Sequence, residues 1–455
     1  MEGGKGLIGG IGRGDIMDWQ LWLLLIFGIL LVLMLTGMPI ALCFFIINVI
    51  GMYALFGGAM GLQNLINSLY TSLNSFILLP IPLFILMGEV MFQSKIAPIL
   101  IQVVGKWMGK LPGRLALLAV ASGTLFSTLT GTSLASVAML GSTLVPEMEA
   151  QGYKKPMSLG PILGSGGLAM LIPPSALAVL CGAIGEISIS KILIGIIVPG
   201  LLVAGIMTFY IVARCMLQTE LAPTYDVVKV PLSEKLTDTA KYVLPQGLVI
   251  FAVIGLMFLG IASPSEAAAC GAIGTCLLAA CYRRFNWEVI KKTTTSSLNV
   301  TGMILIIIGG AQAFSQILAF TGASAGMAEF ATNLPVPPIV IIIAMQVIIL
   351  FLGCLMDVVS IMMITLPIFI PVVRELGYND VWYAVTYLIN IEIAGISPPF
   401  GLSLFVMRGV APNDTTMADV YKAAMPFIGC SLLAMILIIL FPVIALWLPS
   451  LAGTR

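Results

Sequence analysis

The 455-residue sequence contains no histidine and few charged residues. Without histidine, the chain lacks the usual acid–base group at neutral pH and the imidazole ligand of most zinc and haem sites. Asp, Glu, Lys and Arg make up 9% of the residues, whereas soluble domains carry about a quarter. The formal net charge is +1 and no basic block occurs, so we expect no nucleic-acid partner. These shortages exclude most soluble enzymes and nucleic-acid-binding proteins.

Two kinds of motif are also missing. No GxxxxGK[ST] phosphate-binding loop occurs, so we expect this chain not to hydrolyse ATP. The eight cysteines are scattered through apolar runs without a CxxC pair, which is typical of small buried thiols rather than of a redox centre. Because no histidine is available as the base for a serine nucleophile, we predict that the protein is not an enzyme.

Apolar residues dominate what is present, at 60% of the chain with a mean hydropathy of +1.11. A membrane-spanning helix needs about 20 apolar residues, and such runs recur along the sequence. The composition therefore predicts an all-α polytopic membrane protein in a lipid bilayer. Trp19 and Trp22 open the first run with no basic region before a cleavage site, so we interpret it as a retained span. Residues 1–16 are a Gly-rich extension, either a linker or a stretch upstream of a start at Met17.

An internal repeat is visible at a fixed offset of 225 residues. Recurring prolines are informative here because the effect of proline on the backbone depends on its position, whereas Leu-on-Ile matches mean nothing in so apolar a chain. The matches are Pro39 with Pro264, Pro146 with Pro371, Pro173-Pro174 with Pro398-Pro399, Gly152-Tyr153 with Gly377-Tyr378, and Ser72-Leu73-Asn74 with Ser297-Leu298-Asn299. They predict that the chain is duplicated.

The duplication divides the chain into two similar halves. The first half covers 17–216, with a hairpin at about 114–150 and a broken helix at about 157–187. The second half covers 244–449, with a hairpin at about 338–375 and a broken helix at about 381–407. A cytoplasmic connecting arm at 217–243 separates the halves, and 450–455 form a tail.

The basic residues predict the topology. Arg114 and Lys154-Lys155 flank one apolar segment, and cytoplasmic loops are the ones enriched in Lys and Arg. That segment therefore enters and returns as a re-entrant hairpin with Gly131-Thr132-Ser133 at its tip. Each half then has about five transmembrane helices plus one hairpin, and the odd number of crossings inverts the second half. We expect Gly152 on the cytoplasmic side and Gly377 on the periplasmic side.

Polar interruptions of the apolar runs indicate where a cation and a solute bind. Irregular backbone at membrane depth is tolerated only where protein or water satisfies it, and paired interruptions in two halves are the sequence sign of a secondary transporter site. At Gly131-Thr132-Ser133, freed carbonyls and two hydroxyls form a compact set of oxygen ligands. Pro173 and Pro174 supply no N–H, so carbonyls around 167–172 lose their donors.

The second half offers Asp357 and Ser360 against carbonyls near 395–397. A charge at membrane depth costs at least about 2.5 kcal/mol unless it is paired, and a bound cation would pair Asp357. Such carbonyl and hydroxyl sets suit an alkali cation such as Na⁺. Two alternatives remain open: proline kinks whose hydroxyls bond back to their own helix, and pairing of Asp357 with an Arg or Lys. Glu392, which precedes Ser397-Pro398-Pro399, is a further candidate near the site.

A family resemblance rests on the combined spacing of these motifs. They are Gly131-Thr132-Ser133, Pro146, Gly152-Tyr153, Leu171-Ile172-Pro173-Pro174-Ser175, Asp357, Pro371, Gly377-Tyr378 and Ile396-Ser397-Pro398-Pro399. The chain from Met17 onward resembles the large membrane subunit of tripartite ATP-independent periplasmic (TRAP) transporters. The resemblance implies an elevator-type carrier driven by Na⁺ in the bacterial inner membrane. It also implies a small membrane (Q) subunit, here a separate chain, and a periplasmic substrate-binding (P) protein.

The resemblance also implies site residues and substrates. The first Na⁺ site falls on Thr132, Ser133, Gly167, Met170 and Pro173, and the second on Asp357, Ser360, Gly395, Ser397 and Pro398. The substrate-binding candidates are Gly131, Ser133, Ser175, Asp357 and Ser397. The implied solutes are small carboxylates: sialic acid, C4-dicarboxylates or other sugar acids.

Other functions fit the sequence less well, and one of them stays open. A stand-alone Na⁺- or H⁺-coupled dicarboxylate symporter of the divalent-anion type would need no binding protein. A channel is disfavoured, because matched hairpins with one buried Asp provide no ring of carbonyls or charges. No Arg at a predicted hairpin tip marks a carboxylate clamp, so the sequence does not name the substrate.

Overall fold

The computed structural model describes residues 18–109, 111–130, 133–223, 230–354, 356–399 and 401–452. All regular structure in these ranges is helical. This is expected of apolar runs in a bilayer, because a helix satisfies its backbone hydrogen bonds internally where no water is available. Gly131 and Thr132, the first two residues of the predicted hairpin tip, lie outside the described residues.

The described residues of the first half form eleven α-helices and two short 3₁₀ helices, labelled η. These are α1 (Trp19–Leu35), α2 (Ile40–Leu55), α3 (Ala59–Leu73), η1 (Phe76–Leu78), α4 (Pro80–Gln93), α5 (Ala97–Trp107), α6 (Arg114–Thr130), α7 (Ser133–Ala150), α8 (Lys155–Gly167), η2 (Leu168–Met170), α9 (Ala176–Gly185), α10 (Ile189–Gly195) and α11 (Ile197–Leu217).

The described chain after α11 continues with the α-helices of the connecting region and the second half, together with two short helices labelled η. These are η3 (Thr219–Leu221), α12 (Leu232–Asp238), the π-helix η4 (Thr239–Val243), α13 (Leu244–Phe258), α14 (Pro264–Cys281), α15 (Trp287–Phe320), α16 (Ala323–Thr332), α17 (Pro338–Gly353), α18 (Val358–Glu375), α19 (Asp380–Ile396), α20 (Leu402–Val410), α21 (Met417–Leu440) and α22 (Val443–Leu451). The starts of α7 and α18, at Ser133 and Val358, are 225 residues apart, as are those of α8 and α19, at Lys155 and Asp380.

Seven helical stretches of the described chain are long and apolar enough to cross a membrane. They are Phe76–Gln93, Ile189–Leu217, Leu232–Phe258, Pro264–Cys281, Trp287–Phe320, Val358–Glu375 and Met417–Leu440. Shorter apolar helices, among them α2, α9 and α17, accompany them. The protein is therefore an all-helical, multi-pass membrane protein.

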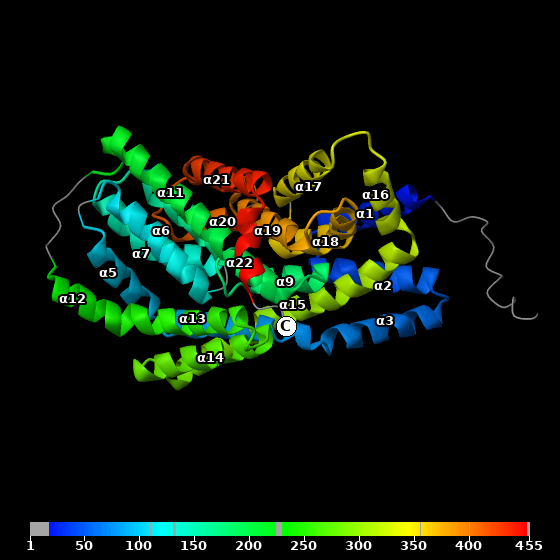
Figure 1. Cartoon of the computed structure of the whole chain (residues 1–455), viewed down its shortest axis with the longest axis horizontal. Coiled ribbons are helices and arrows are strands. Elements are labelled where there is room, and N and C mark those ends of the chain that lie inside the picture. The colour runs from blue at the N-terminus through cyan, green and yellow to red at the C-terminus, as the bar shows by residue number, and fades with distance from the viewer. Residues whose placement is uncertain are drawn as a thin grey trace, which may run out of the picture.

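The helices form two layers (Figure 1). One layer, along the lower edge of the view, contains α13, α14, α15 and α3. In this layer α15 packs against α2, α3 and α4, and α14 packs against α4. The other layer holds the helices around the interruptions, with α6 and α7 towards one end and α17 and α18 towards the other. There α8 packs against α6, α7 and α21.

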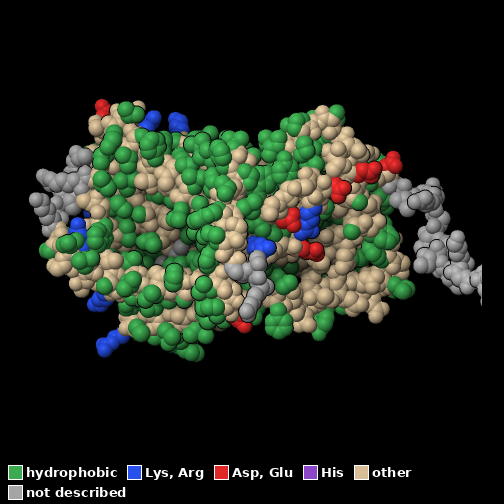
Figure 2. All heavy atoms as spheres, viewed as in Figure 1, with side chains coloured by type: hydrophobic (Ala, Val, Ile, Leu, Met, Phe, Trp, Pro, Cys, Tyr) green, Lys and Arg blue, Asp and Glu red, His purple; other side chains and the backbone are tan. Residues whose placement is uncertain are grey.

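The most buried helices of the molecule are the two that carry the Pro-Pro breaks. In α19 every residue from Val381 to Ile396 is buried, and in α8 every residue from Met157 to Gly167 is buried. Large apolar side chains such as Phe209, Phe251 and Phe351 are exposed instead, and hydrophobic side chains are widespread on the visible face, where charged ones are few (Figure 2). This distribution suits a lipid-facing exterior around a packed centre.

The predicted connecting arm is partly helical and continues into a membrane helix. From Leu232 the chain forms α12 and η4 and runs without a break into α13. Lys106 near the end of α5 forms ion pairs with Glu234 at 2.6 Å and Asp238 at 2.5 Å, and the Trp107 indole donates to the Thr239 hydroxyl at 2.9 Å. These contacts order α12, so the helix begins at Leu232, earlier than the span predicted from residue 244.

Candidate functional site

Ser133 joins the first interruption to the second half of the chain. It begins α7 and is 5% exposed. Its hydroxyl lies 3.1 Å from the hydroxyl of Ser403, a buried residue of α20. Sequence reasoning missed Ser403, although a hydroxyl in the apolar run just after Pro398-Pro399 was a usable signal. Each half of the chain therefore contributes one hydroxyl oxygen to this contact.

The first Pro-Pro break opens the backbone beside this pair. α8 ends at Gly167, the chain tightens into η2 as far as Met170, and α9 begins only at Ala176. Pro173 and Pro174 have no N–H for the carbonyls of Ala169 and Met170, which a continuous helix would pair with residues 173 and 174. The predicted substrate residue Ser175 caps α9, since its hydroxyl accepts from the Ala178 N–H at 3.2 Å. All these residues are buried.

The second interruption contains Asp357, which acts as a helix cap. Its carboxylate accepts from the N–H groups of Val359 and Ser360, both at 3.1 Å, and from the Ser360 hydroxyl. A carboxylate at a helix N-terminus is stabilised by these donors and by the helix dipole. In the described part of the chain Asp357 has no ion pair with Lys or Arg. The helix that it caps thus partly compensates the charge of Asp357. This differs from both alternatives of the sequence analysis, the proline kinks and the pairing of Asp357 with Arg or Lys.

The second Pro-Pro break leads back to Ser403. α19 ends at Ile396, and the Ser397 hydroxyl donates to the Ile393 carbonyl at 2.8 Å. Its lone pairs stay available, but its proton bonds to its own helix, as one alternative anticipated. A side chain added at Gly395 would lie 4.0 Å from both the Met170 methyl carbon and the Ser403 hydroxyl. The two breaks therefore approach each other around Ser403.

The structure brings some of the predicted site residues together and leaves others apart. Ser133, Met170 and Gly395 are brought together around Ser403. Gly167, at the start of η2, lies against Glu392 of α19. Pro173 and Pro398 occupy the breaks themselves, and Asp357 with Ser360 forms a separate cap. Among the described residues no hydrogen bond connects Asp357 with Ser133.

A buried carboxylate lies next to this centre. Glu392 is 0% exposed; its Oε1 accepts a long hydrogen bond of 3.5 Å from the Ser431 hydroxyl, and its Oε2 has no partner within the described ranges. A Cβ atom at Gly167 would come within 2.4 Å of the Glu392 Cγ. Position 167 therefore requires glycine, because Glu392 of α19 leaves no room for a side chain where α8 ends.

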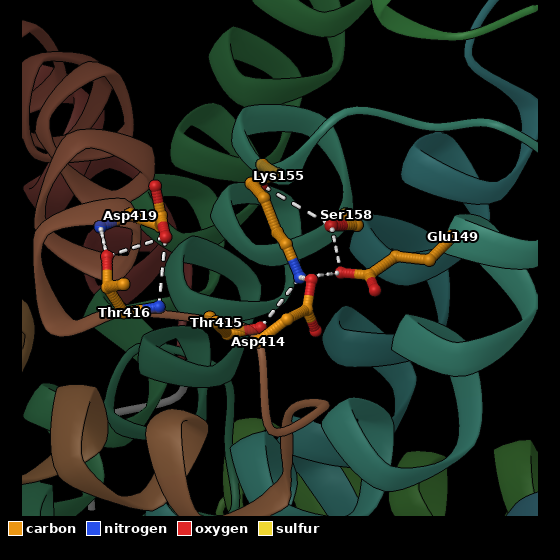
Figure 3. Close-up of polar contacts among 7 residues, drawn as sticks. All are labelled: Glu149, Lys155, Ser158, Asp414, Thr415, Thr416 and Asp419. Carbon is orange, nitrogen blue, oxygen red and sulfur yellow. Dashed lines mark hydrogen bonds and ion pairs between the residues drawn. The ribbon is translucent and has the colours of Figure 1, made fainter.

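An ionic cluster ties the two halves together at another point (Figure 3). The Lys155 ammonium lies 2.9 Å from Glu149, 3.0 Å from Asp414 and 2.8 Å from the Thr415 hydroxyl. Burial alone would lower the pKa of Lys155, but its hydrogen bonds to Glu149 and Asp414 outweigh this and raise the pKa. The α7–α8 turn is thereby fixed to the α20–α21 loop.

Two broken helices and two interrupted helix pairs are the arrangement typical of a secondary transporter rather than of an enzyme. Residues 27–444 match the family model described as "Tripartite ATP-independent periplasmic transporter, DctM component". The chain belongs to this family and is the large permease of a bacterial TRAP system. It is 31% identical to the C4-dicarboxylate TRAP transporter large permease of Pseudomonas aeruginosa, covering 86% of this chain and 90% of that protein.

Other relatives have different solutes in their names. The ectoine TRAP transporter large permease of Halomonas elongata is 30% identical, over 92% of this chain and 97% of its own length. The isethionate permease DctMQ of Oleidesulfovibrio alaskensis is 26% identical, and this chain covers 65% of it. The crystal structure of the Alcanivorax borkumensis YdaH transporter superposes with a TM-score of 0.62 at 17% identity, covering 87% of this chain and 91% of that one. That likeness concerns the fold.

Proposed function

We propose that this permease uses a Na⁺ gradient to import small carboxylate-bearing solutes, of the sialic acid, sugar-acid or C4-dicarboxylate class. The observation that carries the proposal is the meeting of the two breaks at Ser133 and Ser403, whose hydroxyls lie 3.1 Å apart beside Met170 and Gly395. Hydroxyls and carbonyls are the oxygen ligands that an alkali cation takes. The described chain has no His/Cys/Asp/Glu cluster of the kind transition metals prefer.

The residues divide into two ion sites in this proposal. Ser133 and Thr132, with carbonyls of Gly167, Met170 and Pro173, hold one Na⁺. Asp357 and Ser360, with Gly395, Ser397 and Pro398, hold the other. The observed cap at Asp357 supports the second site, because it positions the carboxylate at the helix end. Ser175 and Ser397 extend the polar surface towards the solute.

The solute class is supported by the relatives. Their names give C4-dicarboxylate, ectoine and isethionate as solutes. Each of these is a small molecule with an acidic group, and Na⁺ bound at the centre would supply the positive charge that no Arg at a hairpin tip provides. Coupling follows if the cation and the anionic solute each raise the affinity for the other.

The mechanism we propose is movement of one layer against the other. The inverted repeat, with hairpins entering from opposite sides, would give two pseudo-symmetric states. The layer around α8 and α19 carries the site, and the layer of α3, α4, α13, α14 and α15 is the stationary scaffold. The centre then moves as a unit, which suits its burial and the ionic cluster at Lys155.

The partners follow from the tripartite system. We infer a small membrane (Q) subunit and a periplasmic binding (P) protein that delivers the solute, with the assembly in the bacterial inner membrane. A permease that includes both membrane parts exists in the isethionate DctMQ protein, which supports close association of the two membrane subunits.

The test is uptake into proteoliposomes that contain the permease, its Q subunit and its P protein. Uptake should require a Na⁺ gradient and should vanish when Na⁺ is replaced by K⁺ or choline, with no ATP present. Full uptake under a pH gradient in Na⁺-free buffer would contradict Na⁺ coupling and favour protons. Omission of the P protein is the control: undiminished uptake of free solute would favour a stand-alone dicarboxylate symporter.

A further inference from the structure

A polar cavity of about 510 Å³ lies away from the two interruptions. It is lined by α3, η1, the C-terminal half of α15 and the C-terminal end of α9. α3 and α15 belong to the proposed scaffold, whereas α9 follows directly on the first Pro-Pro break. The cavity therefore spans the boundary between the two layers, at the opposite end of α9 from Ser175.

The wall contributed by α3 is a polar stripe with helical spacing. Asn64, Asn67, Ser68, Thr71 and Ser72 all line the cavity. Their spacing of three, four and seven residues places them on one face of α3. A polar face of a membrane helix turns to water or protein rather than to lipid, so this stripe marks a hydrated surface.

The wall of the cavity that α15 contributes is also polar. Gln312 and Gln316, one turn apart on α15, line the cavity and are exposed. On the α3 wall, the residue Ser68 is 7% exposed, and its buried hydroxyl has no hydrogen-bond partner among the described residues. Buried hydroxyls are usually paired, so Ser68 points to a partner that is absent from the chain itself. Carboxamides and hydroxyls can both donate and accept hydrogen bonds without carrying charge.

The charge of the cavity limits what it can hold. Glu186 is the one acidic residue in its lining, and no Lys or Arg lines it in the described part of the molecule. Arg374 lies next to the lining, since it donates to the Gly185 and Glu186 carbonyls, but it is not a lining residue and its charge is paired with Asp380 at 2.8 Å. A dianion would meet a carboxylate and no cation, whereas a hydroxyl-rich solute would find many neutral partners.

The cavity is close to the proposed transport site. α9 has ten residues, about 15 Å at 1.5 Å per residue, and it connects Ser175 at the break to Ala183 and Glu186 in the cavity wall. Lys154 and Lys155, which we predict to be cytoplasmic, precede α8, and Glu186 follows α9. The basic residues therefore predict that the cavity lies on the periplasmic side.

We propose that this cavity is a vestibule that binds the solute weakly before it reaches the interruptions. The vestibule selects solutes with several hydroxyl or amide groups and at most one net negative charge. Sugar acids with one carboxylate, and zwitterions, fit it better than dicarboxylates do. This inference rests on the proposed function and narrows its solute class.

The test uses the purified permease alone in liposomes, so that the P protein cannot impose its own selectivity. Cys270 and Cys281, the exposed cysteines of the described chain, are replaced by serine, and Thr71→Cys places a thiol in the vestibule. The rate of modification by a water-soluble maleimide is measured with gluconate, ectoine or succinate. Asn333→Cys, exposed beyond the end of α16 and outside the vestibule, is the matched control.

We expect Thr71→Cys to react, and gluconate or ectoine to slow the reaction several-fold while succinate has little effect. Adding Gln312→Leu and Gln316→Leu should abolish this protection, and Asn333→Cys should show none. The proposal is overturned if Thr71→Cys is unreactive, if no solute protects it, or if succinate protects best. Na⁺-dependent uptake in the complete system is measured in parallel, so loss of protection with retained uptake refutes the vestibule and leaves the transport function standing.

Discussion

At the scale of single residues, Asp357 combines a local role with a proposed ionic one. Its carboxylate caps α18 through two backbone N–H groups and the Ser360 hydroxyl. Asn is as good an N-cap as Asp, whereas Ala at this position costs about 1 kcal/mol. The two substitutions therefore separate capping from cation binding.

We predict that Asp357→Asn folds with nearly unchanged thermal stability in Na⁺-free buffer but needs more Na⁺ to reach a given increase in melting temperature. Asp357→Ala should lose both stability and Na⁺ affinity. The measurement is the melting temperature of each purified protein as a function of Na⁺ concentration. If Asp357→Asn responds to Na⁺ as the wild type does, the carboxylate is a helix cap only.

Ser403 offers a second test, because its hydroxyl is the partner of Ser133 across the two halves. Ser403→Ala leaves the buried Ser133 hydroxyl without this partner, and an unsatisfied buried group costs about 1–3 kcal/mol. We predict that Ser133→Ala and Ser403→Ala together cost less than the sum of the two single changes. Additive costs in a double-mutant cycle would show that the two hydroxyls do not interact.

The sequence located the helix interruptions better than the contacts between them. Polar residues and Pro-Pro pairs inside apolar runs predicted the breaks beside Ser133 and Asp357, since such interruptions are costly in a membrane. The partner of Ser133 lies 270 residues away, and a repeat offset of 225 does not relate the two positions. The cap at Asp357 was missed because its position was interpreted through charge alone, although an Asp before an apolar helix is also an N-cap signal.

At the scale of helices, the α7–α8 turn and the α20–α21 loop are connected by Lys155. Its contacts to Glu149 and Asp414 are partly exposed, which limits their contribution to about 1 kcal/mol. Because the pKa of Lys155 is raised above its usual 10.5, this contribution is complete below pH 10.5 and is lost only as the pH rises through the raised pKa.

We predict that Lys155→Met lowers the melting temperature by a few degrees at neutral pH, because two carboxylates lose their shared cation. Lys154→Met is the matched control, since Lys154 and its partner Glu220 are both largely exposed, and it should have almost no effect. Equal shifts for the two variants, measured side by side, would contradict a linking role for the cluster.

Helix boundaries were predictable where proline or a polar interruption sets them and less so elsewhere. α8 and α19 end near the breaks that the Pro-Pro pairs predicted, since proline removes a donor wherever it occurs. The start of the helix that continues into α13 was not predictable from hydropathy, because α12 is polar. It is ordered by Lys106, Glu234 and Asp238, contacts between segments more than 120 positions apart.

For the molecule as a whole, we predict that the two halves have opposite orientations in the membrane. A cysteine at Gly152 should react with a membrane-impermeant thiol reagent only from the cytoplasmic side, and one at Gly377 only from the periplasmic side. Both glycines have positive φ, 82° and 76°, so the adjacent positions Gln151 and Leu376 serve as unstrained alternatives. Labelling of both turns from one side would disprove the inverted repeat.

The all-helical, multi-pass class was predictable from composition, and the family from the spacing of the motifs. Continuous apolar runs of about 20 residues favour helices, because a helix satisfies its backbone hydrogen bonds within the segment. The layer arrangement was not predictable, since helix packing depends on shape at positions such as Gly167, where only glycine fits against Glu392. The polar cavity at α3 was also missed, because its walls come from three segments far apart in the sequence.

We propose above that the two interruptions of the apolar helices bind Na⁺. The most direct measurement is the melting temperature of the purified permease, with titration of Na⁺ against K⁺ at constant ionic strength. We predict that Na⁺ raises the melting temperature by mass action and that K⁺ does not. The rise should be smaller when Ser133 or Asp357 is replaced. Identical stability in the two salts across the titration would show that the interruptions do not bind Na⁺ selectively.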